Sequence, residues 1–311
     1  MTHAAMQLGR RAPKNAPALK LARFLTWVTP RHPVAVNHFG GVSDWGLYEN
    51  DRYGDCGPAS VANLRKMVTL YLGGAERSPS QDDVFDLYRR SGNPGFDPVD
   101  PGGEGDGGVD MQTMLEAVRA EGIGGVRCAG FAKVDHTNLD EMRAAIAIFG
   151  GLLLGVNLET AQQRQTSRGV WTWENSAEWG GHAVLAGAYT SAVSGSDVGV
   201  ITWGEIVGLT RAFERHQLEE AWVVIWPEQQ GTRAFQEGVN QAALAGDYFA
   251  LTGRQWPTPG NTPPAPPPPG GPDDADRALA AVLHGWITGR RTGENARVEH
   301  AAKAWLAAKE L

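Results

Sequence analysis

Apolar residues recur at helical spacing through the first half of the chain and gather into short continuous runs in the second half. In 57–74 ("GPASVANLRKMVTLYLGG") they lie three or four positions apart, which predicts a helix ended by a glycine pair. Three further segments predict helices: 80–92 with Ser80 as N-cap, 109–122 and 138–150. Runs typical of strands lie at 151–158, 181–190, 198–204 and 221–226. A helical half followed by a β-rich half predicts the α+β class.

The proline-rich stretch 255–274, "QWPTPGNTPPAPPPPGGPDD", divides the chain. Runs of this kind adopt extended conformations that cannot pack into a core. We therefore expect a body over 1–254, a linker over 255–274 and a helical hairpin over 275–311. Such a hairpin has too little core to be stable alone, so we expect it to dock on the body, on a second copy or on a partner.

Composition narrows the function classes. The chain has 311 residues, of which 42% are hydrophobic, and a formal net charge of −7, with no long basic run of the kind that binds nucleic acid. Its two cysteines, Cys56 and Cys128, are too few for a disulfide framework or a Cys-based zinc site, and the scattered histidines indicate no metal or other cofactor. No window reaches the roughly 18 apolar residues of a membrane span, and no signal peptide is recognisable. We expect a protein kept in a reducing cytoplasm or released without a cleaved signal.

Two residues have the types and placement of a nucleophile and its base. Cys56, in "NDRYGDCGPASVAN" (50–63), stands where the first predicted helix begins. The free N–H groups and the dipole at a helix start lower a thiol's pKa and can hold an oxyanion. Burial in the core is the alternative, because free cysteine usually just packs. His182 opens the apolar run of "WGGHAVLAGAY", and a cysteine at a helix start with such a histidine is typical of cysteine hydrolases.

Together with "ITWGE" (201–205), these motifs resemble those of the papain-like cysteine peptidases over roughly residues 6–228. The resemblance implies an α+β, papain-like fold in which the helix with the nucleophile packs on an antiparallel β half. It makes Cys56 the nucleophile and His182 the base, and it puts Asn50, six residues before Cys56, in place of the family's oxyanion-hole glutamine. "ENDRYGDCGPA", "GGHAVLAGAY" and "TWGEIVGLTRAF" are also similar to motifs of phage and bacterial members of the superfamily (GNDxxGDC, GHAV, WG).

The chain departs from the family at the residue that orients the histidine. The family's asparagine falls on Ile201, which cannot hydrogen-bond an imidazole. We expect Thr202, Asp197 or Glu205 to take the role, or else a bare Cys–His pair. A misoriented base lowers the rate by orders of magnitude.

For several other residues the sequence predicts a less specific role. Four tryptophans near His182 are expected to wall an apolar substrate groove, with core packing or a lid as the alternative; they are Trp171, Trp173, Trp179 and Trp203. Asp55 is expected to cap the helix, and Cys128 to lie in the core. Three charged residues are expected to support the turn after the TWG strand and not to contact substrate. They are Arg211, Glu219 and Glu220. Residues 1–35 are a candidate for a propeptide-like cover.

These features predict a phage-encoded cysteine hydrolase that cleaves amide bonds in a protein or a cell-wall peptide, in the bacterial host cytoplasm or in the virion. The alternative is a non-enzymatic virion or assembly component, held through 275–311 to a phage structural protein or to a second copy. A sulfur within reach of an imidazole nitrogen and facing an open groove favours the enzyme. A cleft filled by tryptophans or by the N-terminal segment favours the structural role.

Overall fold

The computed structural model describes residues 6–14, 16–26, 32–100, 103–190 and 193–258. The chain divides between Ala265 and Pro266 into two compact units, and the first holds all of these residues. The expected hairpin (275–311) and most of the expected linker lie outside the described residues.

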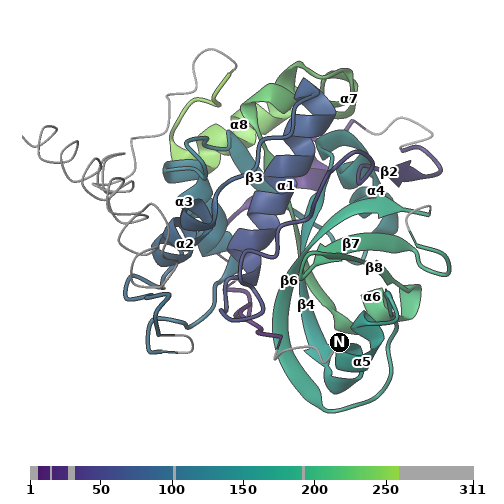
Figure 1. The fold of residues 1–311 in the computed structure, drawn as a ribbon. Coiled ribbons are helices and arrows are strands. Elements are labelled where there is room, and N and C mark those ends of the chain that lie inside the picture. Colours follow the sequence, from purple (N-terminus) through teal and green to yellow (C-terminus); the bar gives the residue numbers. More distant parts are fainter. Residues whose placement is uncertain (1–5, 15, 27–31, 101–102, 191–192, 259–311) are drawn as a thin grey trace, which may run out of the picture. The chain divides into compact units, whose positions relative to one another are not determined.

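The four helices predicted between residues 57 and 150 are all present. They are α1 (Cys56–Gly73), α2 (Gln81–Arg90), α3 (Met111–Ala120) and α4 (Leu139–Phe149). Ser80 caps α2 as predicted, because its side chain accepts a hydrogen bond from the backbone N–H of Asp83. The first three helices form one side of the molecule, with α1 passing along the sheet (Figure 1).

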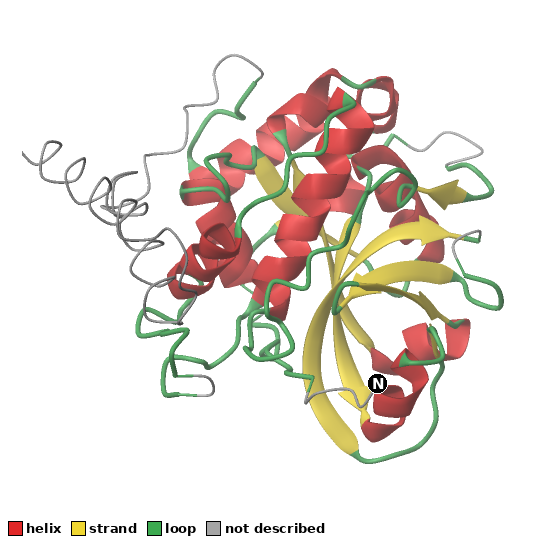
Figure 2. Ribbon diagram, viewed as in Figure 1, coloured by secondary structure: helices red, strands yellow, loops and turns green. Residues whose placement is uncertain are grey.

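In the described part of the chain, nine strands form a single sheet (Figure 2). They are β1 (Leu19–Lys20), β2 (Val36–Asn37), β3 (Gly130–Val134), β4 (Leu152–Glu159), β5 (Val170–Trp171), β6 (Glu178–Tyr189), β7 (Val198–Thr202), β8 (Glu205–Leu209) and β9 (Leu218–Ile225). The order is β1-β3-β9-β4-β6-β7-β8-β5, and β2 pairs with β6. The central pairs are antiparallel, as expected, whereas β1 with β3 and β5 with β8 are parallel.

The remaining described helices follow β1, connect strands of the second half or follow the last strand. They are η1 (Leu21–Arg23), α5 (Thr160–Thr166), α6 (Arg211–Gln217), η2 (Pro227–Gly231), α7 (Arg233–Gly238) and α8 (Gln241–Thr252). Among the described helices, none combines the length and the apolar character that crossing a bilayer requires.

The described body continues past the boundary expected at residue 254. Trp256 packs edge-on against Tyr248 of α8, with ring centroids 5.1 Å apart, and its indole N–H donates to Gln230 Oε1 over 2.9 Å. The first residues of the expected linker therefore pack on the body.

The sheet has a core on each face because neighbouring residues of a strand point to opposite sides. On β6, Ala183 and Leu185 belong to the cluster that includes α1, α2 and α3. Val184 and Ala186 belong to the other, which includes α4. Strand β6 thus contributes side chains to both cores. Its N-terminal part carries His182.

Candidate active site

Cys56 is the first residue of α1, as the sequence predicts, but the residue before it does not act as expected. Asp55 occupies the N-cap position, yet its side chain makes no capping hydrogen bond. Both carboxylate oxygens are buried without a hydrogen-bond partner among the described residues. Burial raises the pKa of Asp55 well above its usual range.

The thiol of Cys56 is completely buried. The backbone N–H groups of Ala183 and Gly9 are directed at the sulfur and lower its pKa, but burial outweighs them and raises the pKa of Cys56 to about 11. The N–H of Ala183 belongs to the residue after His182. The nucleophile candidate therefore lies against the strand position that carries the base candidate.

His182 is also completely buried, and two neighbours fix its ring. Its Nε2 lies 2.8 Å from Thr202 Oγ1, and the indole of Trp203 stacks on it with centroids 4.3 Å apart and planes 16° apart. Nδ1 has no hydrogen-bond partner among the described residues, so it is not bonded to Cys56 in this state. Burial, and then the charge of Arg10, lower the pKa of His182 to about 3. The imidazole and the thiol are both neutral here.

A tight hairpin brings Thr202 and Trp203 to the histidine. Thr202 pairs with Glu205 across the two-residue turn Trp203–Gly204, whose residues have φ angles of 45° and 75°. Turns with two positive φ angles fit the twist of a hairpin, but a bulky residue adopts them at a cost of about 1–2 kcal/mol. The ring of Trp203 reaches His182 from this strained position.

Of the three expected orienting residues, only Thr202 contacts the imidazole in the described structure. Asp197 precedes β7, whereas Thr202 ends it, so the two are about 16 Å apart along the strand. Glu205 is exposed at the start of β8. Ile201 is buried in the core and pairs with Leu185, as its apolar side chain requires.

Asn50 ends a turn in which Tyr48 and Glu49 both have positive φ angles, near 54°. Its backbone N–H donates to Leu47 O over 3.1 Å, and its side chain is buried. Its Oδ1 has no hydrogen-bond partner among the described residues. The side-chain amide is thus held in the body without a partner for its oxygen, and the oxyanion-hole role stays a prediction.

The four tryptophans do not form one groove. Trp171 is fully buried and donates from its indole N–H to Thr166 Oγ1, so the expectation that it lines a groove is wrong. Trp173 is 39% exposed and stacks on His216. Trp179 stacks on Trp203 and so belongs, with it, to the surroundings of His182.

The N-terminal segment 8–11 covers both candidates. The Arg10 N–H donates to Gly181 O over 3.0 Å, and Val109 exchanges two backbone hydrogen bonds with the segment, from its N–H to Gly9 O and from the Arg11 N–H to its carbonyl. The fit is tight, because a Cβ on Gly9 would lie 1.9 Å from the carbonyl oxygen of Gly54. The segment therefore lies like an added strand between the helical half and the β half, over the expected nucleophile.

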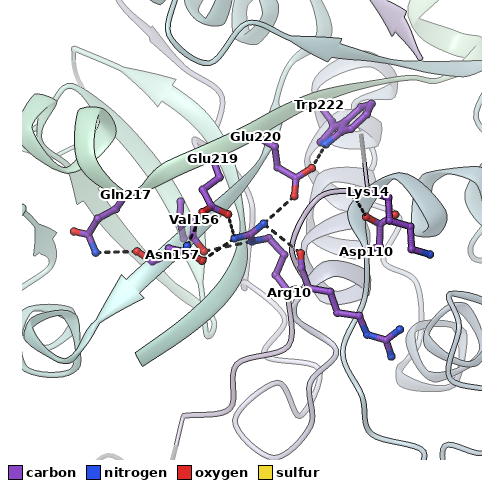
Figure 3. A network of polar contacts seen from close by, with 10 residues as sticks. Arg10, Lys14, Asp110, Val156, Asn157, Gln217, Glu219, Glu220 and Trp222 are labelled. Carbon is purple, nitrogen blue, oxygen red and sulfur yellow. Dashed lines mark hydrogen bonds and ion pairs between the residues drawn. The ribbon is translucent and has the colours of Figure 1, made fainter. Parts of the chain in front are cut away.

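The side chain of Arg10 enters a polar pocket on the β half. It forms ion pairs with Glu219 and Glu220 of β9, so the expectation that these two only support a turn is wrong (Figure 3). Arg211 pairs locally with Glu214 of its own helix over 3.0 Å. Nothing in the spacing of "MQLGRRAPK" (6–14) indicated this contact, which joins residues 210 positions apart.

In the part of the chain that the structure describes, no group of three or more His, Cys, Asp and Glu side chains is arranged to hold a metal ion. Cys128 is buried, as expected, and burial raises its thiol pKa to about 12.

The fold is that of the papain-like cysteine proteases. Xylellain, a cysteine protease from Xylella fastidiosa, superposes with a TM-score of 0.55 at 12% identity, over 73% of this chain and 98% of its own. Procathepsin B S9 from Trypanosoma congolense covers 72% of this chain and 87% of its own, with a TM-score of 0.48 and 11% identity. The protease CMS1MS2 from Carica candamarcensis covers 62% and 99%, with a TM-score of 0.45 and 17% identity. The sequence matches no protein-family profile and no curated protein.

Proposed function

We propose that this chain is a papain-like cysteine hydrolase that cleaves amide bonds, with Cys56 as nucleophile and His182 as base. One observation carries the proposal: Thr202 holds Nε2 of His182, while Nδ1 is left without a partner. When the Thr202 hydroxyl accepts from Nε2–H, Nδ1 carries the lone pair and can take a proton. The thiol lies next to the same strand, at the N–H of Ala183.

The chemistry follows from these positions. Nδ1 of His182 takes the thiol proton, and the sulfur of Cys56 adds to the amide carbonyl carbon. The backbone N–H of Cys56 and the side chain of Asn50 stabilise the negative oxygen of the tetrahedral intermediate. The imidazolium then protonates the departing amine, the C–N bond breaks, and water hydrolyses the thioester. Amides of proteins and of peptidoglycan stem peptides both fit this sequence of steps.

Turnover requires that segment 8–11 leaves. While it covers the site, the pKa of the thiol is about 11 and that of the imidazole about 3, so near pH 7 both groups are neutral. Water that enters on opening reverses the burial effect, which lowers the thiol pKa and raises the imidazole pKa. The thiolate–imidazolium pair then becomes accessible.

The test is the rate of Cys56 alkylation by iodoacetamide between pH 4 and 9. The chain carries Cys128→Ala, so that one thiol remains, and is compared with and without His182→Ala, each also with Gly9→Ala to displace the cover. We expect labelling at pH 6 that is fast in the uncovered chain and collapses without His182. Slow labelling that rises only with the ionisation of an ordinary thiol, and ignores His182, would refute the hydrolase.

A second candidate is a non-enzymatic role for the same fold. It is favoured by the complete burial of Cys56 and His182 and by the missing hydrogen bond between them. On this proposal the covered site is a permanent part of the core. The uncovered variant separates the two candidates, because a purely structural Cys56 would gain no dependence on His182.

A further inference from the structure

We propose that the pocket formed by Glu219, Glu220 and Asn157 is a subsite for an arginine side chain of a peptide substrate. The inference rests on the proposed function for its chemical step, and it names the substrate class: polypeptides with an arginine beside the scissile bond. In this structure Arg10 of the chain itself fills the pocket.

The pocket contacts all three nitrogens of the Arg10 guanidinium (Figure 3). Arg10 Nη1 donates to Glu220 Oε1 over 3.0 Å, and Nη2 donates to Asn157 Oδ1 over 2.9 Å and pairs with Glu219. Nε donates to the carbonyl of Val156 over 3.4 Å. The Arg10 side chain is 1% exposed. Two carboxylates, an amide and a carbonyl around one planar group match the fixed fork of arginine rather than the point charge of lysine.

The pocket walls have supports that do not depend on Arg10. Glu220 Oε2 accepts from the indole N–H of Trp222 over 2.7 Å, and Asn157 O accepts from Gln217 Nε2 over 2.9 Å. The floor is Gly155, where β4 shifts register against β9. A Cβ there would lie 2.5 Å from Glu220 Cγ and 2.8 Å from Arg10 Cδ, so a residue without a side chain makes room for both.

Charge explains why the pocket selects a cation. The Glu220 side chain is 1% exposed, and a buried carboxylate is costly unless it is paired. Once segment 8–11 leaves, Glu220 keeps its hydrogen bond from Trp222 but loses its counter-ion. A substrate that brings a guanidinium restores the pair, whereas a neutral or acidic side chain leaves the carboxylate unpaired.

The backbone of the segment shows how a peptide lies in the same place. It hydrogen-bonds Gly181 on the β half and Val109 on the helical half, as an added strand would. The N–H of Gly9 is directed at the Cys56 sulfur, so the backbone of the segment passes the expected nucleophile. A substrate with a carbonyl at that point would place the arginine close to the scissile bond.

The test measures binding, which needs no chemistry. The full chain carries Cys56→Ala, Arg10→Ala and Gly9→Ala, so that the pocket is vacant and the covering segment is displaced. The probe is the fluorescein-labelled peptide MQLGRRAPK, compared by fluorescence anisotropy with the same peptide carrying citrulline, a neutral isostere, at the first arginine. We expect the arginine peptide to bind about tenfold tighter or more, because truncating a buried ion pair weakens binding by at least that factor.

Variants of the two glutamates test whether the preference for arginine over citrulline arises from the pocket. Glu220→Gln, which keeps an acceptor for Trp222, is expected to remove the difference between the two peptides, and Glu219→Gln to reduce it. Glu228→Gln is the matched control, because Glu228 loses the same charge but pairs with Arg65 instead. Equal binding of both peptides, no binding of either, or a difference that survives both pocket variants would overturn the subsite.

The peptide-binding test of the subsite and the alkylation test of the hydrolase can fail independently of each other. An arginine preference in binding, together with Cys56 alkylation that ignores His182, would leave the subsite and refute the enzyme. A His182-dependent thiolate without an arginine preference would leave the enzyme and refute the subsite.

Discussion

The hydroxyl of Thr202 lies within hydrogen-bonding distance of the imidazole of His182. Its oxygen is 2.8 Å from Nε2, and Thr202 is itself 4% exposed, so water does not compete for the contact. A neutral imidazole carries one N–H, and directing it to Thr202 leaves the lone pair on Nδ1. On the proposed function, Thr202 is the positioning residue for His182, in the part that the resemblance assigns to an asparagine.

Replacing Thr202 with valine, which keeps the shape and removes the hydroxyl, is therefore expected to weaken the base. We predict that Thr202→Val slows His182-dependent alkylation of Cys56 at pH 6 by about tenfold or more, because the ring loses its fixed tautomer. The measurement is made in the Gly9→Ala, Cys128→Ala chain.

Thr202→Ser is the control, because it retains the hydroxyl and should keep most of the rate. A valine variant that labels as fast as the serine variant would show that Trp203 stacking alone orients the ring.

The sequence alone predicts the positions of some site residues better than others. Cys56 and His182 stand in local motifs, at a helix start and in a glycine-flanked strand, and both lie where those motifs predict. The orienting group was expected among three candidates because Ile201 replaces the asparagine. Which of them reaches the imidazole depends on the turn at Trp203, whose positive φ no local pattern indicated.

At the scale of elements, segment 8–11 covers the candidate site. It is held by three backbone hydrogen bonds to Gly181 and Val109 and by the buried guanidinium of Arg10. Its closest approach to the body is at Gly9, where a Cβ would lie 1.9 Å from Gly54 O. Because that neighbour is backbone, it cannot rotate away as a side chain would.

Gly9→Ala is accordingly predicted to displace the segment and expose Cys56. The overlap is expected to shift the covered–uncovered equilibrium enough to raise the alkylation rate about tenfold, since overpacking of this kind costs about 1–3 kcal/mol. The rate of iodoacetamide labelling at pH 7 in the Cys128→Ala chain measures it.

Gly40→Ala is the matched control for this prediction. A Cβ on Gly40 meets nothing within 4 Å, so the same chemical change should leave labelling unaltered. Equal rates in the two alanine variants would mean that the segment tolerates the substitution without leaving.

The elements themselves were predictable to different degrees. Long helices with apolar periodicity, such as α1, and the long strands β4 and β6 lie close to the segments expected from the sequence. Two-residue strands such as β1 and β5 carry no periodicity of their own and exist because a neighbour pairs with them. Their parallel pairing at the sheet edges is likewise a product of tertiary packing.

The whole molecule decides the contacts that sequence reasoning missed. Arg10 meets Glu220 across 210 positions, and it does so because the helical half and the β half meet along the line that segment 8–11 follows. The carboxylates of the pocket are carried by β9 and its amide by β4. These strands are neighbours in the sheet, although Asn157 and Glu219 are 62 positions apart in the sequence. Adjacent acidic residues in a sequence do not reveal that one of them is buried beside a cation.

Burial of the site also links the stability of the whole fold to pH. The folded pKa of His182 is about 3, while an unfolded histidine has a pKa of about 6.5, so between these values only the unfolded chain binds the proton. The neutral imidazole thus stabilises the fold fully above pH 6.5. That contribution declines as the pH falls toward 3.

We predict that His182 alone makes the free energy of unfolding fall by roughly 1 kcal/mol for each pH unit below 6.5. Urea denaturation of the wild type and of His182→Gln at pH 7, 6, 5 and 4 measures it, because all other titrating groups are common to both chains. The two stability curves should converge as the pH falls. A difference that stays constant would mean that His182 is solvated in the folded chain.

In the Gly9→Ala variant, water is expected to reach the ring and Arg10 to leave. The same comparison should then give a weaker pH dependence, since the pKa of His182 in the folded chain lies nearer to its ordinary value.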